Sequence, residues 1–185
     1  RGPLERAREA GRFWHVEDRV VFRLCDGLSG IAPEEVDALV IAGMGGETIA
    51  NILEAAPWVK EKDFPIILQP MSTQAELRGW LWRNGFLCLR EKTVLEGETL
   101  YSIILARQGG AVPMTPAEEW AGRQYPGMED PLRGLLLDHL LGRVRRALDG
   151  MARSRAPAEA RRRELEQVLE GLMEMRKEWD AWQQR

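Results

Sequence analysis

The chain has 185 residues, with 26 Lys and Arg against 29 Asp and Glu, and its formal net charge is −3 at pH 7. Its 44% hydrophobic and 30% charged residues exclude a disordered chain, and its longest apolar runs are too short to span a bilayer. Two cysteines and two histidines are too few for a disulfide framework or a metal cluster, so we expect no metal and a reducing, cytoplasmic compartment. The overall charge favours no nucleic-acid partner, which leaves only a local basic patch to bind one.

The first third of the chain alternates predicted helix and strand. A helix predicted over residues 3–10, ending at Gly11, is followed by the β-branched segment Val20–Cys25, which predicts a strand. Residues 37–42 form a nearly continuous apolar run, typical of a strand buried on both faces in a parallel sheet. The glycine-rich segment Gly43–Gly46 ends that strand and precedes a helix predicted over residues 47–55.

The next segments complete the predicted sheet. A short strand over residues 65–68 is followed by a helix over 74–84, which Ser72-Thr73 should cap and Gly85 should end. Two further strands, over 86–95 and 100–106, are joined by a Glu-Gly-Glu turn and predict an antiparallel hairpin. This order predicts an α/β fold with a doubly wound sheet that is finished by a hairpin.

No strand is predicted after the glycine-containing joint at residues 108–113. A short helix over 117–125 precedes two longer helices, over 131–153 and 157–184, with a break at 153–157. Apolar residues recur along both long helices at alternating steps of three and four, which predicts a coiled-coil hairpin with the two seams face to face. The seam residues are Leu137, Leu141, Val144, Leu148 and Met151 on the first helix, and Leu165, Val168, Leu172, Met175, Trp179 and Trp182 on the second. We therefore divide the chain into an α/β domain, residues 1–112, and a helical domain, residues 113–185.

Three loops follow predicted strands and are candidates for a binding site. Glycines at 43, 45 and 46 would let a ligand approach the backbone, Asp26 could accept hydrogen bonds from an adenine amino group or a ribose hydroxyl, and Gln69 can donate and accept. Strand carboxyl ends meet at one edge of a doubly wound sheet, so these loops predict a shared cleft. The alternative for each loop is a purely structural turn. The glycine spacing does not match the dinucleotide-binding fingerprint, which argues against a nucleotide-binding oxidoreductase.

A basic patch is predicted around the break between the long helices. Residues 132–163 contain nine arginines and three acidic residues, and the planar guanidinium group suits phosphate. The alternative is a solvated charged face that Glu164 and Glu166 partly neutralise. The arginines assigned to RNA binding are Arg143, Arg145, Arg146, Arg153, Arg155, Arg161, Arg162 and Arg163.

Three motifs, DGL at 26–28, VIAGMGG at 40–46 and LQPM at 68–71, resemble those of the bacterial tRNA (adenine(22)-N1)-methyltransferases, and the resemblance extends over nearly the whole chain. It implies a class I methyltransferase fold, S-adenosylmethionine as cofactor, and methyl transfer to N1 of an adenine in tRNA. Cofactor contacts are implied for Asp26, Gly27, Leu28, Ala42 and Gly43. A loop facing the target base is implied for Gly43, Met44, Gly45, Gly46, Gln69 and Pro70.

The chain departs from that family at its start. Family members begin with a strand and a glycine-containing loop for the methionine part of the cofactor, then a second strand whose terminal acid holds the ribose. This sequence opens after that acid, so we expect an N-terminally truncated copy whose sheet lacks the first two strands and has an open apolar edge. The alternative function is a non-catalytic RNA-binding or coiled-coil interaction module.

Overall fold

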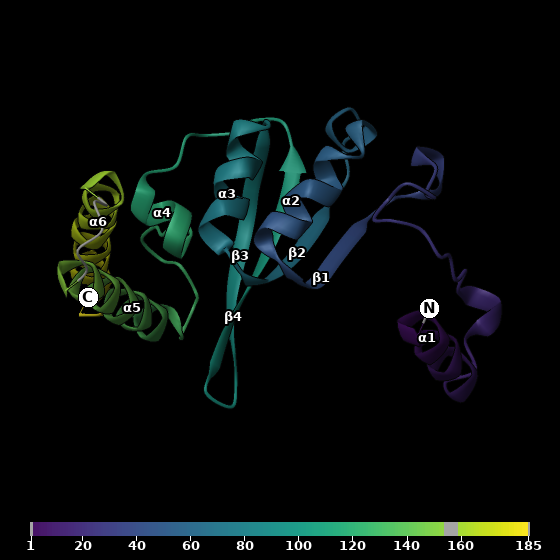
Figure 1. Cartoon of the computed structure of the whole chain (residues 1–185), viewed down its shortest axis with the longest axis horizontal. Helices are drawn as coiled ribbons and strands as arrows, with labels where there is room; N and C mark the ends of the chain where they lie inside the picture. The colour runs from purple at the N-terminus through teal and green to yellow at the C-terminus, as the bar shows by residue number, and fades with distance from the viewer. Residues whose placement is uncertain (1, 154–158, 185) are drawn as a thin grey trace.

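A four-stranded mixed sheet forms the centre of the computed structural model, which describes residues 2–153 and 159–184 (Figure 1). The strand order is β1-β2-β4-β3. Strands β1 (Leu39–Gly45) and β2 (Ile66–Ser72) run parallel, whereas β3 (Phe86–Glu96) and β4 (Thr99–Gln108) form a hairpin whose β4 pairs antiparallel with β2. The predicted α/β class and the terminal hairpin are therefore confirmed.

Helices α2 (Gly46–Glu54) and α3 (Gln74–Arg83) lie side by side over one face of the sheet (Figure 1). Their apolar side chains pack on the inward-facing side chains of the strands and form the first hydrophobic core. The completely buried residues of this core include Ile49, Leu53, Leu77, Leu81, Leu68 and Ile104. This packing fixes the carboxyl ends of β1 and β2 next to the first turns of α2 and α3.

The opposite face of the sheet is open in the described ranges. Val40 on β1 is 62% exposed and Ile67 on β2 is 37% exposed. The prediction that residues 37–42 form a strand buried on both faces is therefore wrong in its burial, because α2 and α3 cover one side only. We call this surface, which also includes Ile103 and Leu105 of β4, the open face.

The strand predicted at Val20–Cys25 is wrong, since these residues have no paired neighbour and Val21 is 76% exposed. A β-branched composition favours a strand only where another strand supplies hydrogen bonds and a packing surface. Before this segment, α1 (Gly2–Phe13) continues past the predicted stop at Gly11 and lies away from the sheet (Figure 1). Short 3-10 helices span Glu17–Arg19, Pro33–Glu35 and Pro57–Lys60.

The C-terminal helices form a second hydrophobic core. Helices α5 (Arg133–Arg153) and α6 (Glu159–Gln183) pack along the predicted seams, and the short helix α4 (Pro116–Ala121) packs against α6. The seam residues buried in this core are Leu137, Leu141, Val144, Leu165, Val168, Leu172, Met175 and Trp179. The helical hairpin is confirmed, while the domain division at residue 112 stays a prediction. No described helix is both long and apolar enough to cross a membrane.

Candidate functional site

The carboxyl ends of β1 and β2 lie side by side. The strand register places Ala42 opposite Gln69 and Met44 opposite Pro70, with irregular pairing around Met44. The backbone N–H of Gly43 donates a hydrogen bond of 2.9 Å to Oε1 of Gln69. These five residues therefore form one continuous edge, which we call the rim, and the structure brings both predicted base-facing segments together there.

The prediction that Gly43–Gly46 end the strand as a loop is wrong, since β1 continues to Gly45 and α2 begins at Gly46. The glycines of this segment have different surroundings. Gly43 has φ +77°, and a Cβ added to it would meet nothing within 4 Å, so its backbone is open to a ligand. Gly46 is buried at the start of α2, where an added Cβ would lie 2.1 Å from the carbonyl oxygen of Thr73. Gly46 is thus required for close packing of α2 on the β2–α3 connection, whereas Gly43 leaves space at the rim.

Thr73 has a role that sequence reasoning missed. It stands at the N-cap of α3, as expected, but its side chain makes no cap hydrogen bond there. Its hydroxyl oxygen instead accepts a hydrogen bond of 3.2 Å from the backbone N–H of Glu47, in the first turn of α2. One threonine therefore satisfies an unpaired N–H of the neighbouring helix, a contact between distant segments that no local sequence signal indicates.

The segment Asp26–Leu28 lies against α2 rather than at the rim. Gly27 has φ +52°, and a Cβ there would be 3.1 Å from the side chain of Ile52, six residues into α2 and thus about 9 Å along the helix from Gly46. Leu28 packs against the first hydrophobic core. Within the described residues, no hydrogen bond joins this segment to Gly43–Gly46, so its cofactor role stays a prediction.

An ion pair closes the loop that carries Asp26–Leu28. The guanidinium group of Arg23 donates to the carboxylate of Glu35 and, over 3.0 Å, to the carbonyl oxygen of Gly30. The Arg23 hydrogen bonds, together with one from the backbone N–H of Ala32, lower the pKa of Glu35 to about 2. The loop is therefore held by the Arg23–Glu35 ion pair and its hydrogen bonds, and not by pairing with a strand.

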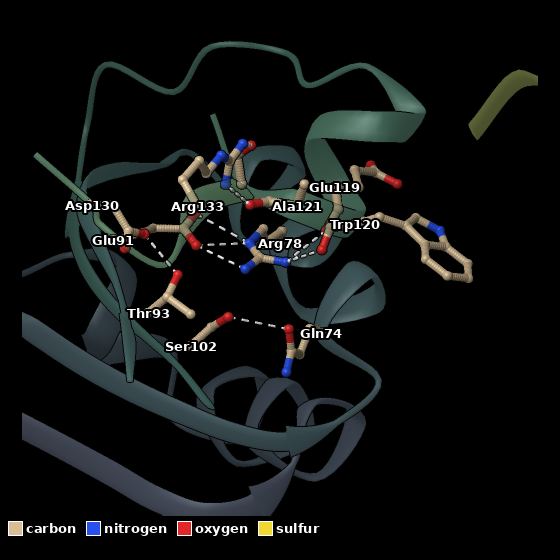
Figure 2. A network of polar contacts seen from close by, with 11 residues as sticks. Gln74, Arg78, Glu91, Thr93, Ser102, Glu119, Trp120, Ala121, Asp130 and Arg133 are labelled. Atoms are coloured by element: carbon tan, nitrogen blue, oxygen red, sulfur yellow. Dashed lines mark hydrogen bonds and ion pairs between the residues drawn. The ribbon is translucent and has the colours of Figure 1, made fainter. Parts of the chain in front are cut away.

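A buried arginine connects the sheet with the helical part (Figure 2). Arg78 of α3 is completely buried and donates to both carboxylate oxygens of Glu91 on β3, with its Nη2 2.8 Å from Oε2. Its Nη1 donates to the carbonyl oxygens of Glu119 and Trp120, each over 2.9 Å. The guanidinium group thus joins α3, β3 and the end of α4.

A second buried guanidinium group completes this junction. Arg133, at the start of α5, donates to the carbonyl oxygens of Ala121 and Gly122, so the two arginines together bind four successive carbonyls at the C-terminal end of α4. Burial lowers the pKa of Arg133 to about 10, an effect that the nearby carboxylates of Glu91 and Asp130 oppose. Sequence reasoning counted Arg133 among the residues of the basic patch, but the structure places it in the interior.

The predicted RNA-binding arginines do not share one environment. The pairing predicted for Glu164 and Glu166 is confirmed, since they bind Arg161 and Arg162 over 2.7 and 2.9 Å. Arg143 instead lies over the ring of Trp120, 5.4 Å from its centroid. The exposed side chains are those of Arg143, Arg145, Arg146, Arg153, Arg161, Arg162 and Arg163, whereas Arg155 lies outside the described residues.

The methyltransferase-domain family matches residues 1–104. The tRNA (adenine(22)-N(1))-methyltransferase of Bacillus subtilis (strain 168) is 32% identical over 108 residues, which make up 58% of this chain and 45% of that protein. The chain therefore spans less than half the length of this curated relative.

Two solved structures share the fold. A protein in the NADB-Rossmann superfamily from Streptococcus agalactiae has a TM-score of 0.78 and 24% identity, covering 95% of this chain and 76% of its own. TrmK of M. capricolum, in complex with the cofactor product S-adenosyl-homocysteine, has a TM-score of 0.73 and 18% identity, covering 95% and 76%. The chain belongs to the methyltransferase-domain family, and its predicted resemblance to the tRNA (adenine(22)-N1)-methyltransferases is confirmed.

Proposed function

We propose that this chain carries the base-facing part of an S-adenosylmethionine-dependent site that methylates N1 of an adenine in tRNA, at position 22 by analogy with the Bacillus subtilis relative. The observation that supports this proposal is the rim itself. Gly43 and Gln69 meet at the carboxyl ends of two parallel strands, where sheets of this class bind their ligands. The open backbone of Gly43 leaves space for a planar base, and the side-chain amide of Gln69, which is held by its hydrogen bond to Gly43, can contact the edge of that base.

The residues present fit part of the cofactor's requirements. S-adenosylmethionine supplies a methyl group on a positively charged sulfur, and the exposed Ala42 with the open backbone of Gly43 gives a ligand close access. The exposed carboxylate of Asp26 offers acceptors for adenine or ribose groups. Gly27 and Leu28 would hold the loop that carries this carboxylate against α2.

The transfer needs positioning more than acid–base catalysis. Adenine N1 has a free lone pair, which forms the new bond to the methyl carbon while the carbon–sulfur bond breaks and its electron pair stays on sulfur. No proton moves, so the chain contributes by holding the two atoms in line. Oε1 of Gln69 accepts from Gly43 and retains a second lone pair, which would stabilise the cationic product base. The target base would have to leave the tRNA stack to reach the rim.

The experiment is a methyl-transfer assay with the 185-residue chain and tRNA transcripts that carry A or G at position 22. We expect label from S-adenosylmethionine in the adenine transcript alone, recovered as 1-methyladenosine by mass spectrometry. Calorimetry should show binding of S-adenosylmethionine and none of NAD. Equal labelling of both transcripts would contradict N1 chemistry. RNA binding without any transfer would instead select a non-catalytic RNA-binding module.

A further inference from the structure

A small cavity lies between the sheet and the helical hairpin, close to the end of β2. It has a volume of about 70 Å³ and is lined by the first turn of α3, by Trp120 at the end of α4, and by Arg143 of α5 and Arg161 of α6. Thr73, which lines it too, directly follows the last residue of β2. We call this cavity the notch; it has room for about two waters or one phosphate group.

One wall of the notch is cationic. The guanidinium group of Arg143 lies over the ring of Trp120 within cation–π distance, and within the described residues it has no ion pair. Arg161 comes from the other long helix and binds Glu164 on its own helix. The contact with the ring uses none of the N–H groups of Arg143, which stay available for a bidentate acceptor such as phosphate.

Acceptor groups line the notch as well. Glu76 and Gln74 line the notch from the first turn of α3. Gln74 is oriented by the hydroxyl of Ser102, which donates to its Oε1 over 3.3 Å (Figure 2). A free phosphate would be repelled by the carboxylate of Glu76, but a ribose 2′-hydroxyl can donate to it. A notch lined by both guanidinium groups and acceptors therefore matches a ribose-phosphate unit better than an isolated anion.

The notch is held in shape by the buried junction. The carbonyl oxygen of Trp120 accepts from Arg78, and the ring projects away from that network (Figure 2). Arg143 therefore lies over a tryptophan, Trp120, whose backbone is hydrogen-bonded to Arg78 and held in place relative to the sheet. Thr73 also bonds to the first turn of α2, which begins beside Gly45, so the notch and the rim share the same short connection.

We propose that the notch binds one ribonucleotide of an RNA strand, with its phosphate on Arg143 and Arg161 and its ribose 2′-hydroxyl on Glu76. This inference rests on the proposed function for its choice of an RNA substrate. It goes further by assigning a nucleotide beside the target adenine to the notch. It also gives the chain a means of distinguishing RNA from DNA, through the ribose 2′-hydroxyl.

Arg145 offers a matched control for Arg143. It is two residues away on α5 and lines the outer groove between α5 and α6, next to Met173 and Arg176. Both side chains are exposed, so replacing either with Gln removes one charge without disturbing a core. Circular dichroism melting of each variant checks that the fold is retained.

The test measures binding of the whole chain to a fluorescent tRNA transcript, by anisotropy, across a range of salt concentrations. Arg143→Gln should weaken binding by about tenfold and lower the slope of log K against log salt by about one unit, while Arg145→Gln should change affinity much less. Equal effects of the two substitutions would show only diffuse surface attraction and would overturn the phosphate assignment.

Glu76→Gln tests the ribose assignment. Affinity for an RNA strand relative to its 2′-deoxy counterpart should fall several-fold in this variant, whereas Glu170→Gln, which replaces an exposed residue of α6 outside the notch, should leave that ratio unchanged. An unchanged ratio in Glu76→Gln would overturn the contact. These readouts are affinities, so they do not depend on methyl transfer. If Arg143→Gln weakens RNA binding more than Arg145→Gln but the chain transfers no methyl group, only the proposed function is contradicted. If the chain transfers the methyl group but both substitutions weaken RNA binding equally, only the assignment of the notch is contradicted.

Discussion

The backbone N–H of Gly43 donates to the side-chain oxygen of Gln69, 26 residues further along the chain, over 2.9 Å. The amide nitrogen of the same side chain lies 3.3 Å from Sδ of Met71. Gln69 therefore ties the carboxyl end of β1 to that of β2, and its amide oxygen and amide nitrogen contact different partners.

The first prediction concerns this bond. Gln69→Ala should leave the Gly43 N–H unpaired and should speed its hydrogen exchange, while Gln69→Glu keeps an acceptor and should keep the protection. NMR of 15N-labelled protein measures both without any assay of activity. Methyl transfer should fall by about tenfold in the alanine variant if Gln69 also positions the base. Unchanged protection of Gly43 in the alanine variant would contradict the role of this contact.

The second prediction separates two glycines of the segment Gly43–Gly46. Gly46→Ala places a methyl group against the backbone carbonyl of Thr73, so α2 or α3 must shift and the free energy of unfolding should fall by about 3 kcal/mol. Gly43→Ala meets open space and strains only its left-handed backbone, for about 1 kcal/mol. Urea unfolding of both variants measures the difference, and equal losses would be inconsistent with the packing described.

The third prediction is a double-mutant cycle on the buried ion pair. Arg78→Met leaves the largely buried carboxylate of Glu91 unpaired and should lower the free energy of unfolding by about 3–5 kcal/mol. Replacing Glu91 with Met in that background removes the orphaned charge, so the double variant should be more stable than Arg78→Met alone. Additive losses, measured by urea unfolding, would mean that the two side chains do not interact energetically.

The fourth prediction concerns the two cysteines. Cys25 is exposed, whereas burial, reinforced by the negative charge of Glu91, raises the pKa of the Cys88 thiol to about 12. At pH 8 only about one Cys88 in ten thousand would be thiolate, the reactive form. Iodoacetamide should therefore modify Cys25 first, with mass spectrometry locating the label. In the Cys25→Ser variant the native protein should stay almost unlabelled until denaturant is added; rapid labelling of Cys88 would contradict its burial.

Structural features that depend on residues within one segment could be predicted from the sequence. The seams of α5 and α6 and the β3–β4 hairpin are encoded by the spacing of apolar residues and by a Glu-Gly-Glu turn, and the structure confirms them. The strand expected at Val20–Cys25 depended on a neighbour elsewhere in the chain, which its own residues do not specify. The pattern of residues in a segment therefore predicts its extended conformation better than it predicts whether another strand pairs with it.

The polar junction was not readable for a related reason. Arg78 stands between Leu77 and Gly79 on α3, and its sequence context is that of an ordinary surface arginine. Its burial depends on Glu91 and on the end of α4, about 40 residues away. The same applies to Thr73, whose hydroxyl serves a different helix from the one it precedes. The rim was predicted because both its segments were expected directly after parallel strands, which end at the same edge; in the structure they are the last residues of β1 and β2 themselves.

The open face has a calorimetric consequence. Val40 and Ile67 are hydrated in the folded chain, so unfolding newly exposes less apolar surface here than in a sheet covered on both sides. Apolar hydration dominates the heat-capacity increment of unfolding, which is about 12–15 cal/mol/K per residue in ordinary domains. This protein should fall below that range, with a correspondingly flatter dependence of its stability on temperature.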